Sequence, residues 1–230
     1  MPDEPGPDEE RRPVGLARAI RHAFAAYLDE IVLFLAVNLI LVVAVALLVA
    51  SSSIVPPLLL LAPLLALPTA VLMRLAVEGA RETAVSWATV REELGRLAWR
   101  KVVLATVQLL ILGIAATNVS LSSGIGGVPG ILSALVAGYA LIAISVYAVA
   151  LWPIVCDPRR EGPLREQLRL AVAVVLVRPL QVGVLAVITV LAVIASVQLI
   201  APGLFLASLV LLAIAAYVVD VADRLRPLEG

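Results

Sequence analysis

Three long stretches without a single Asp, Glu, Lys or Arg limit how this chain can fold. They run from Ile31 to Met73, from Val102 to Cys156 and from Pro179 to Val219, with lengths of 43, 55 and 41 residues. A helix rises about 1.5 Å per residue and needs about 20 apolar residues to cross a bilayer, so each stretch is two spans long. The sequence therefore predicts an all-α polytopic membrane protein with six transmembrane helices, arranged as three hairpins.

The composition agrees with this class. Of the 230 residues, 62% are hydrophobic and 15% are charged, whereas soluble domains are about 45–50% apolar and about 25% charged. The 17 basic and 17 acidic residues cancel, so net charge gives no reason to expect a nucleic-acid partner. The single cysteine excludes an intramolecular disulfide and a cysteine-based metal site. We expect no cofactor and no metal.

The hairpin turns carry no charge, and all 17 basic residues lie in the four segments outside the uncharged stretches. The positive-inside rule then places both termini and both charged loops in the cytoplasm. Residues 1–13 are acidic and proline-rich and are expected to form a disordered tail, residues 14–224 a single six-span membrane domain, and residues 225–230 a short C-terminal tail. The spans are expected near residues 31–50, 55–76, 102–119, 131–153, 180–199 and 203–220.

Cytoplasmic amphipathic helices are predicted before the first, third and fifth spans, because apolar residues recur there at helical spacing. Whether this unit is a true threefold repeat or a general feature of such proteins stays open. The second helix, over residues 87–101, is expected to lie along the inner membrane surface, because its apolar stripe would otherwise be exposed to water. The stripes consist of Leu16, Ile20, Phe24, Tyr27 and Ile31, then Trp87, Val90, Leu94 and Leu97, and then Leu164, Leu168 and Val172.

Ionisable side chains are missing from the centres of the spans, so any intramembrane site has to use neutral polar groups. Asn38 and Gln108 lie well inside the membrane and could face one cavity, or they could form hydrogen bonds between helices. The second span contains four prolines, which should kink it.

Charged residues at the inner ends of the spans form a second candidate site. Arg74 and Glu78 are four residues apart and can pair on one helix face. Arg178 immediately precedes Pro179, and together with Asp157 these residues could ring a vestibule that recognises a solute or a partner. The alternative is that they anchor the helices by snorkelling to the interface.

Two parts of the chain carry features in a characteristic order. The first, from Phe34 to Leu121, has Asn38, Pro68-Thr69-Ala70, Arg74 and Trp87, and the second, from Tyr147 to Leu180, has Trp152-Pro153, Leu164 to Leu170 and Arg178-Pro179. This order resembles the YesL-like family of small polytopic bacterial membrane proteins. The resemblance implies a prokaryotic cytoplasmic membrane and an accessory role beside a carbohydrate transporter, and it implies no catalytic residue.

Two functions are therefore expected. The first is a non-enzymatic accessory or assembly partner in solute uptake, with the bilayer and a sugar-transport protein as partners and a homo-oligomer as a further option. The alternative is a transporter or facilitator for an uncharged or amphiphilic small solute. An intramembrane enzyme is the least favoured interpretation, because no acid, base and nucleophile occur together in the sequence.

Overall fold

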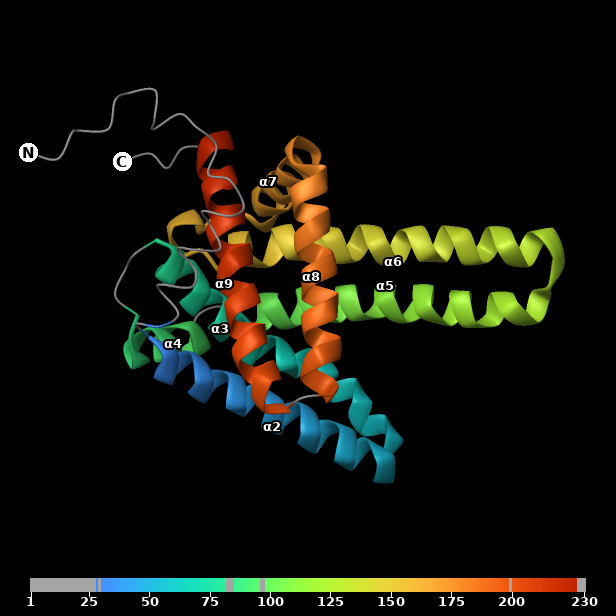
Figure 1. Ribbon diagram of the computed structural model, residues 1–230, viewed down its shortest axis with the longest axis horizontal. Coiled ribbons are helices and arrows are strands. Elements are labelled where there is room, and N and C mark those ends of the chain that lie inside the picture. Colours follow the sequence, from blue (N-terminus) through green and yellow to red (C-terminus); the bar gives the residue numbers. More distant parts are fainter. Residues whose placement is uncertain (1–27, 29, 82–84, 96–97, 199, 227–230) are drawn as a thin grey trace, which may run out of the picture.

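The computed structural model describes residue 28 and residues 30–81, 85–95, 98–198 and 200–226, and every regular element in these ranges is a helix. The predicted tail at residues 1–13 and most of the first amphipathic helix lie outside them. Figure 1 shows the arrangement of the helices. The elements are α2 (Ile31–Ile54), η1 (Pro56–Leu65), α3 (Ala66–Ala80), α4 (Trp87–Gly95), α5 (Ala98–Ile125), α6 (Gly127–Val155), η2 (Pro158–Arg160), α7 (Leu164–Val177), α8 (Pro179–Gln198) and α9 (Ile200–Leu225).

Several of these helices are long and apolar enough to cross a membrane. Five candidate spans have sufficient length and hydropathy: the first is α2, the second is η1 continued by α3, and the others are α5, α6 and α9. A sixth candidate is present if α7 and α8 count as one span bent by 103°. Each of the six predicted ranges overlaps one of α2, η1–α3, α5, α6, α8 and α9. The structure therefore confirms the all-helical class and is compatible with a multi-pass membrane protein.

The prolines of the second span change its helix type, whereas a kink was predicted. A proline removes one backbone donor and clashes with the preceding turn. Pro56 to Leu65, with Pro63 inside it, forms the tighter 3-10 helix η1, and a regular α-helix begins only at Ala66. This span is therefore a 3-10 segment joined to an α-helix.

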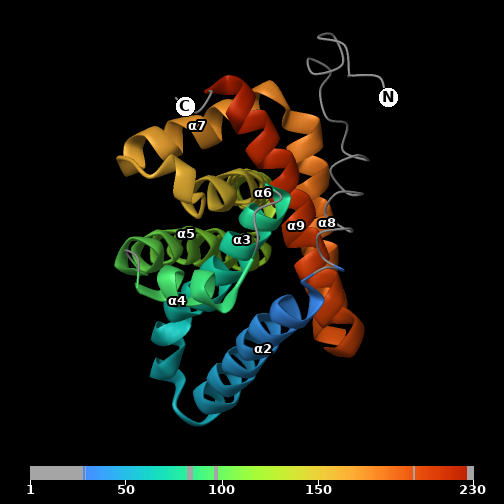
Figure 2. The ribbon, with the colours of Figure 1, turned by 90° about the vertical axis from the view of Figure 1, so that its left-hand side faces the viewer.

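The α5–α6 hairpin extends well beyond the other helices, and α8 and α9 cross it steeply (Figures 1 and 2). Its turn uses Gly126 and Gly127, with φ values of 67° and 62° that glycine adopts without strain. The buried side chains form two clusters. One joins α2, α3 and α9, and the other joins α6, α7, α8 and α9, so α9 is common to both.

The amphipathic helix predicted over residues 87–101 corresponds to α4, which ends at Gly95, and to the start of α5 at Ala98, and residues 96–97 lie outside the described ranges. Trp87 and Leu94 of its apolar stripe are 60% and 52% exposed, which is compatible with a stripe that faces the membrane surface, whereas Val90 packs against the core. Thr89 and Glu93 are buried, and the ion pairs of Glu93 described below lie on this inward side of α4.

The stripe predicted before the fifth span lies only partly on the buried face of its helix. α7 forms as expected, and Leu164 and Leu168 are half-buried. Val172 is 44% exposed, however, and Ala171 and Val174 are buried instead. The inner face of α7 therefore continues through positions 171 and 174, which the stripe of bulky apolar residues did not identify.

Candidate functional site

Charged side chains gather where α3 and α6 end and α5 begins, and we call this region the charged end. The predicted pair of Arg74 and Glu78 forms there, with Arg74 Nε donating to Glu78 Oε1 at 2.7 Å. The Arg74 side chain is only 5% exposed. Because α3 is helical through both residues, their four-residue spacing places them on one face.

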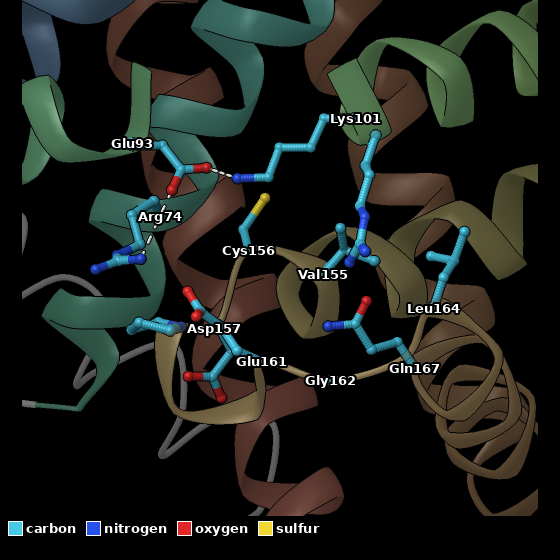
Figure 3. A pocket seen from close by; sticks show the side chains of 12 residues that line it. Arg74, Glu93, Lys101, Val155, Cys156, Asp157, Glu161, Gly162, Leu164 and Gln167 are labelled. Carbon is cyan, nitrogen blue, oxygen red and sulfur yellow. Dashed lines mark hydrogen bonds and ion pairs between the residues drawn. The ribbon is translucent and has the colours of Figure 1, made fainter. Parts of the chain in front are cut away.

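A second acid reaches Arg74 from α4. Glu93 Oε2 lies 3.6 Å from Arg74 Nη1, and Glu93 also accepts a hydrogen bond from Lys101 at the start of α5. Figure 3 shows both contacts. Arg74, Glu78, Glu93 and Lys101 together form the Arg74 cluster. The Glu93 side chain is 2% exposed, so this charge depends on its two cations to compensate for its lost hydration.

The Asp157 cluster lies beside it and consists of Asp157, Arg81, Arg160 and Asp223. Arg81 Nη2 donates to Asp157 Oδ2 at 2.5 Å, and Arg81 Nη1 donates to Asp223 Oδ2 at 3.0 Å. Arg160 donates to Asp223 and lies 3.6 Å from Asp157. Burial alone lowers the pKa of Arg81, but the two carboxylates outweigh it, so the pKa is raised and the guanidinium stays charged.

Each cluster contains two cations and two anions, so neither has an excess charge to offer a ligand. Together they join α3, α4, α5, η2 and α9. The cavity between them has a volume of about 60 Å³ and is lined by Arg74, Glu93, Lys101, Cys156 and Asp157, among others. This volume can hold a few water molecules and no organic solute. The charged end therefore favours a structural role.

Arg178 does not join the other sequence-predicted residues. It caps α7 at the sharp bend before Pro179 and does not line the cavity at the charged end. The predicted ring of Arg74, Glu78, Asp157 and Arg178 is therefore not closed in this structure, and Arg178 lies at the 103° bend between α7 and α8.

Cys156 is expected to resist thiol reagents. It is 2% exposed, and burial raises the pKa of its thiol to about 11. At pH 8 only about a thousandth of such a thiol is the reactive thiolate. A membrane-permeant maleimide should therefore leave native Cys156 unlabelled and modify it after unfolding. A Ser86→Cys variant, exposed at the same end, should label quickly, and equal rates for the two thiols would contradict this burial.

Asn38 and Gln108, the predicted intramembrane pair, make separate contacts. Asn38 Nδ2 donates to Ser208 Oγ at 3.1 Å, which joins α2 to α9, and Asn38 is 2% exposed. Gln108 Oε1 accepts from Trp152 Nε1 at 3.0 Å, which joins α5 to α6. Asn38 therefore acts between helices, and only Gln108 lines a cavity of useful size.

That cavity has a volume of about 380 Å³ and lies among α3, α5, α6, α8 and α9. Its walls are mainly apolar, and none of its lining residues is charged. Gln108 is 8% exposed, and its Nε2 has no hydrogen-bond partner within the described ranges. A buried amide donor without a partner is unfavourable and needs an explanation. We call this space the Gln108 cavity.

The Gln108 cavity lies next to the charged end along three helices. Met73, which lines it, directly precedes Arg74 on α3. Gln108 follows Lys101 by two helical turns on α5, and Trp152 precedes Cys156 by one turn on α6. The two ion clusters therefore lie beyond one end of the cavity.

Sequence reasoning missed most of the residues of the charged end. A signal for Arg81 was present, since Arg74, Glu78 and Arg81 follow a spacing of four and three residues on one helix face. Glu93, Lys101 and Asp223 come from different elements, and nothing local in the sequence identifies them as partners.

No family model, no curated protein and no solved structure matches this chain. The resemblance to the YesL-like family, which uses short motifs around Asn38, Arg74 and Trp87, therefore remains a proposal. What the protein does has to be inferred from the charged end and the Gln108 cavity themselves.

Proposed function

We propose that this protein is a non-enzymatic membrane protein that binds an uncharged or amphiphilic small solute inside its helical bundle and facilitates its uptake. The observation that carries this proposal is the Gln108 cavity, which has a volume of about 380 Å³ and mainly apolar, uncharged walls. Pockets for small molecules are mostly apolar with few polar groups, which fix the orientation of the ligand.

The ion clusters support an uncharged solute. A carboxylate or phosphate at Arg74 or Arg81 would have to compete with the buried acid that each already contacts. Breaking such a pair leaves a buried charge uncompensated and is costly. The Gln108 cavity requires no such exchange, because its lining residues carry no charge.

We further propose six spans in the cytoplasmic membrane of a prokaryote, with the charged end and both termini in the cytoplasm. The support is the distribution of the basic residues, none of which occurs in the outer turns near Ser53 and Gly126. The ion clusters would then lie at the cytoplasmic end of the cavity, and uptake would require them to open.

Cysteine labelling tests this orientation. Ser53 is exposed near the turn of the first hairpin, and Val128 is exposed near the turn of the second. Cysteines at these two positions should react with an impermeant maleimide in intact cells. A cysteine at Ser86 should react only after the membrane is opened. Labelling of the position 86 variant in intact cells would contradict six spans with cytoplasmic termini.

An accessory role beside a sugar-uptake system is the second candidate. The observation that favours it is the exposed apolar surface of Trp87, Leu94 and Trp99, which are 60%, 52% and 63% exposed at the charged end. The guanidinium of Arg100 lies 5.9 Å from the centre of the Trp99 ring. Aromatic and arginine side chains are enriched at protein interfaces.

Flux into liposomes separates the two candidates. If the protein is a facilitator, the purified protein should speed the entry of an uncharged amphiphile, such as 2-dodecanol or a glycerol monoester, into the liposomes. Ala148→Phe should reduce that flux, because Ala148 lines the cavity. Ala143→Phe on the exposed side of the same helix is the matched control. No flux with normally folded protein would favour the accessory role.

A further inference from the structure

The polar groups around the Gln108 cavity are already engaged by the protein. Gln108 accepts the hydrogen bond of the Trp152 indole, and its Nε2 atom has less than 1 Å² of accessible surface, so the chain covers this end of the amide. Thr69, Ser145 and Thr189 each donate their hydroxyl hydrogen to a carbonyl four residues earlier in their own helix. The described side chains of the lining therefore offer a ligand no free hydrogen-bond donor.

A cavity of this kind is poorly suited to water. A buried water molecule needs about two to four polar partners, and apolar cavities stay dry. The volume of about 380 Å³ is large enough for an organic molecule. If the cavity were empty, its walls would lose the van der Waals contacts that a close-packed interior provides. An apolar occupant restores these contacts and needs no hydrogen bond from the walls.

The cavity is exposed along the middle of α8. Its lining residues Val190, Val193 and Ile194 are 50%, 59% and 50% exposed, whereas those on α3, α5, α6 and α9 are buried or half-buried. Val190 lies roughly 16 Å along the helix from Pro179, where α8 begins. This distance is about half the thickness of the hydrocarbon core, which is about 30 Å. In the proposed six-span arrangement, the opening is therefore at the level of the lipid chains.

The surface beside this opening is also apolar. Val187 and Leu191, which are neighbours of the lining residues on α8, are each 59% exposed. A charged headgroup at this level would lose its hydration without finding a counter-charge among the lining residues. The molecule that a bilayer supplies here in excess is a lipid acyl chain.

We infer that the Gln108 cavity binds the acyl chain of a bilayer lipid, which enters sideways past Val190 and Val193 while its headgroup stays at the membrane surface. The cavity fits part of one chain and not a whole phospholipid. The inference rests on the proposed function, since it names the alkyl chain as the part of an amphiphile that this site recognises. A solute such as a glycerol monoester would then compete with the lipid chain for the same space.

Fluorescence quenching of Trp152, which lines the cavity, tests this inference. Trp87→Phe with Trp99→Phe leaves Trp152 as the only tryptophan of the chain. The purified protein is placed in vesicles of phosphatidylcholine, either unmodified or brominated in the middle of the acyl chains, because bromine quenches tryptophan only on contact. We expect strong quenching by the brominated lipid. Ala148→Phe fills the cavity and should abolish most of this quenching, while Ala143→Phe on the exposed side of the same helix should preserve it.

A second variant and a second measurement support this test. Ala186→Leu fills the cavity from α8 and replaces Ala148→Phe if the latter folds poorly. A phosphatidylcholine with a photoreactive diazirine in the middle of its acyl chain requires no substitution in the protein. After illumination, mass spectrometry should locate the label on the cavity side of α6, at Ser145 or Ala148. Labels on α6 that are confined to outward positions such as Ala143 would overturn the inference.

The possible results separate the inference from the proposed function. Quenching that persists in a folded variant with a filled cavity, or that is missing in the unfilled protein, overturns the acyl-chain inference. If Ala148→Phe still reduces the liposome flux of 2-dodecanol in that case, the cavity takes a solute and the proposed function stands. Quenching that depends on the cavity, without any flux, would support lipid binding and overturn facilitated uptake.

Discussion

Replacing Asp157 with Asn is expected to lower the free energy of unfolding by about 3–5 kcal/mol, the range for removing one partner of a buried ion pair. The Asp157 side chain is fully buried and contacts Arg81 at 2.5 Å and Arg160 at 3.6 Å. The variant leaves two buried guanidinium groups to share the single carboxylate of Asp223. Unfolding of the purified protein in mixed micelles, followed by circular dichroism, measures the change.

The matched control for this variant is Asp220→Asn. Asp220 pairs with Arg224 at 3.0 Å on the same helix as Asp223, but its side chain is 27% exposed and that of Arg224 is 36% exposed. Exposed pairs four residues apart contribute about 0.3–0.5 kcal/mol, so this change should be nearly silent. Equal effects of the two substitutions would contradict a stabilising role for the Asp157 cluster.

Glu93→Gln is expected to have an effect of similar size, about 3–5 kcal/mol. Glu93 lies between Arg74 and Lys101 with its side chain 2% exposed, and its neutralisation leaves Lys101 without its acid partner in the Arg74 cluster. Glu92→Gln is the control at the next position, because the Glu92 side chain is 50% exposed and 3.7 Å from Arg74. The measurement is again unfolding in mixed micelles.

A double variant distinguishes the ion pair from a general effect of residue 93. Adding Lys101→Met to Glu93→Gln removes the uncompensated cation, so part of the lost stability should return. The two changes are then non-additive, as expected for residues in direct contact. Additive losses would show that Glu93 and Lys101 stabilise the protein independently.

The positions of the helices could be predicted from the sequence because they depend on local properties. Uncharged stretches, proline positions and a four-residue spacing located the long helices, the distortion before Ala66 and the pair of Arg74 and Glu78. Each of these features is determined by residues close together in the chain.

Features that depend on distant residues were not predictable in this way. Asn38 contacts Ser208, 170 positions away, and no local pattern indicates that partner. The buried position of Glu93 on the nine-residue helix α4 was not predicted either, because its partners Arg74 and Lys101 lie on other helices.

The length of the α5–α6 hairpin has a consequence for the lipid around it. The two helices contain 28 and 29 residues, so each is roughly 42–44 Å long at about 1.5 Å per residue. The hydrocarbon core of a bilayer is only about 30 Å thick. In a bilayer the hairpin would have to tilt, stretch the nearby acyl chains or extend its neutral tip into the headgroups. Hydrophobic mismatch would then favour thicker membranes as the surroundings of this protein.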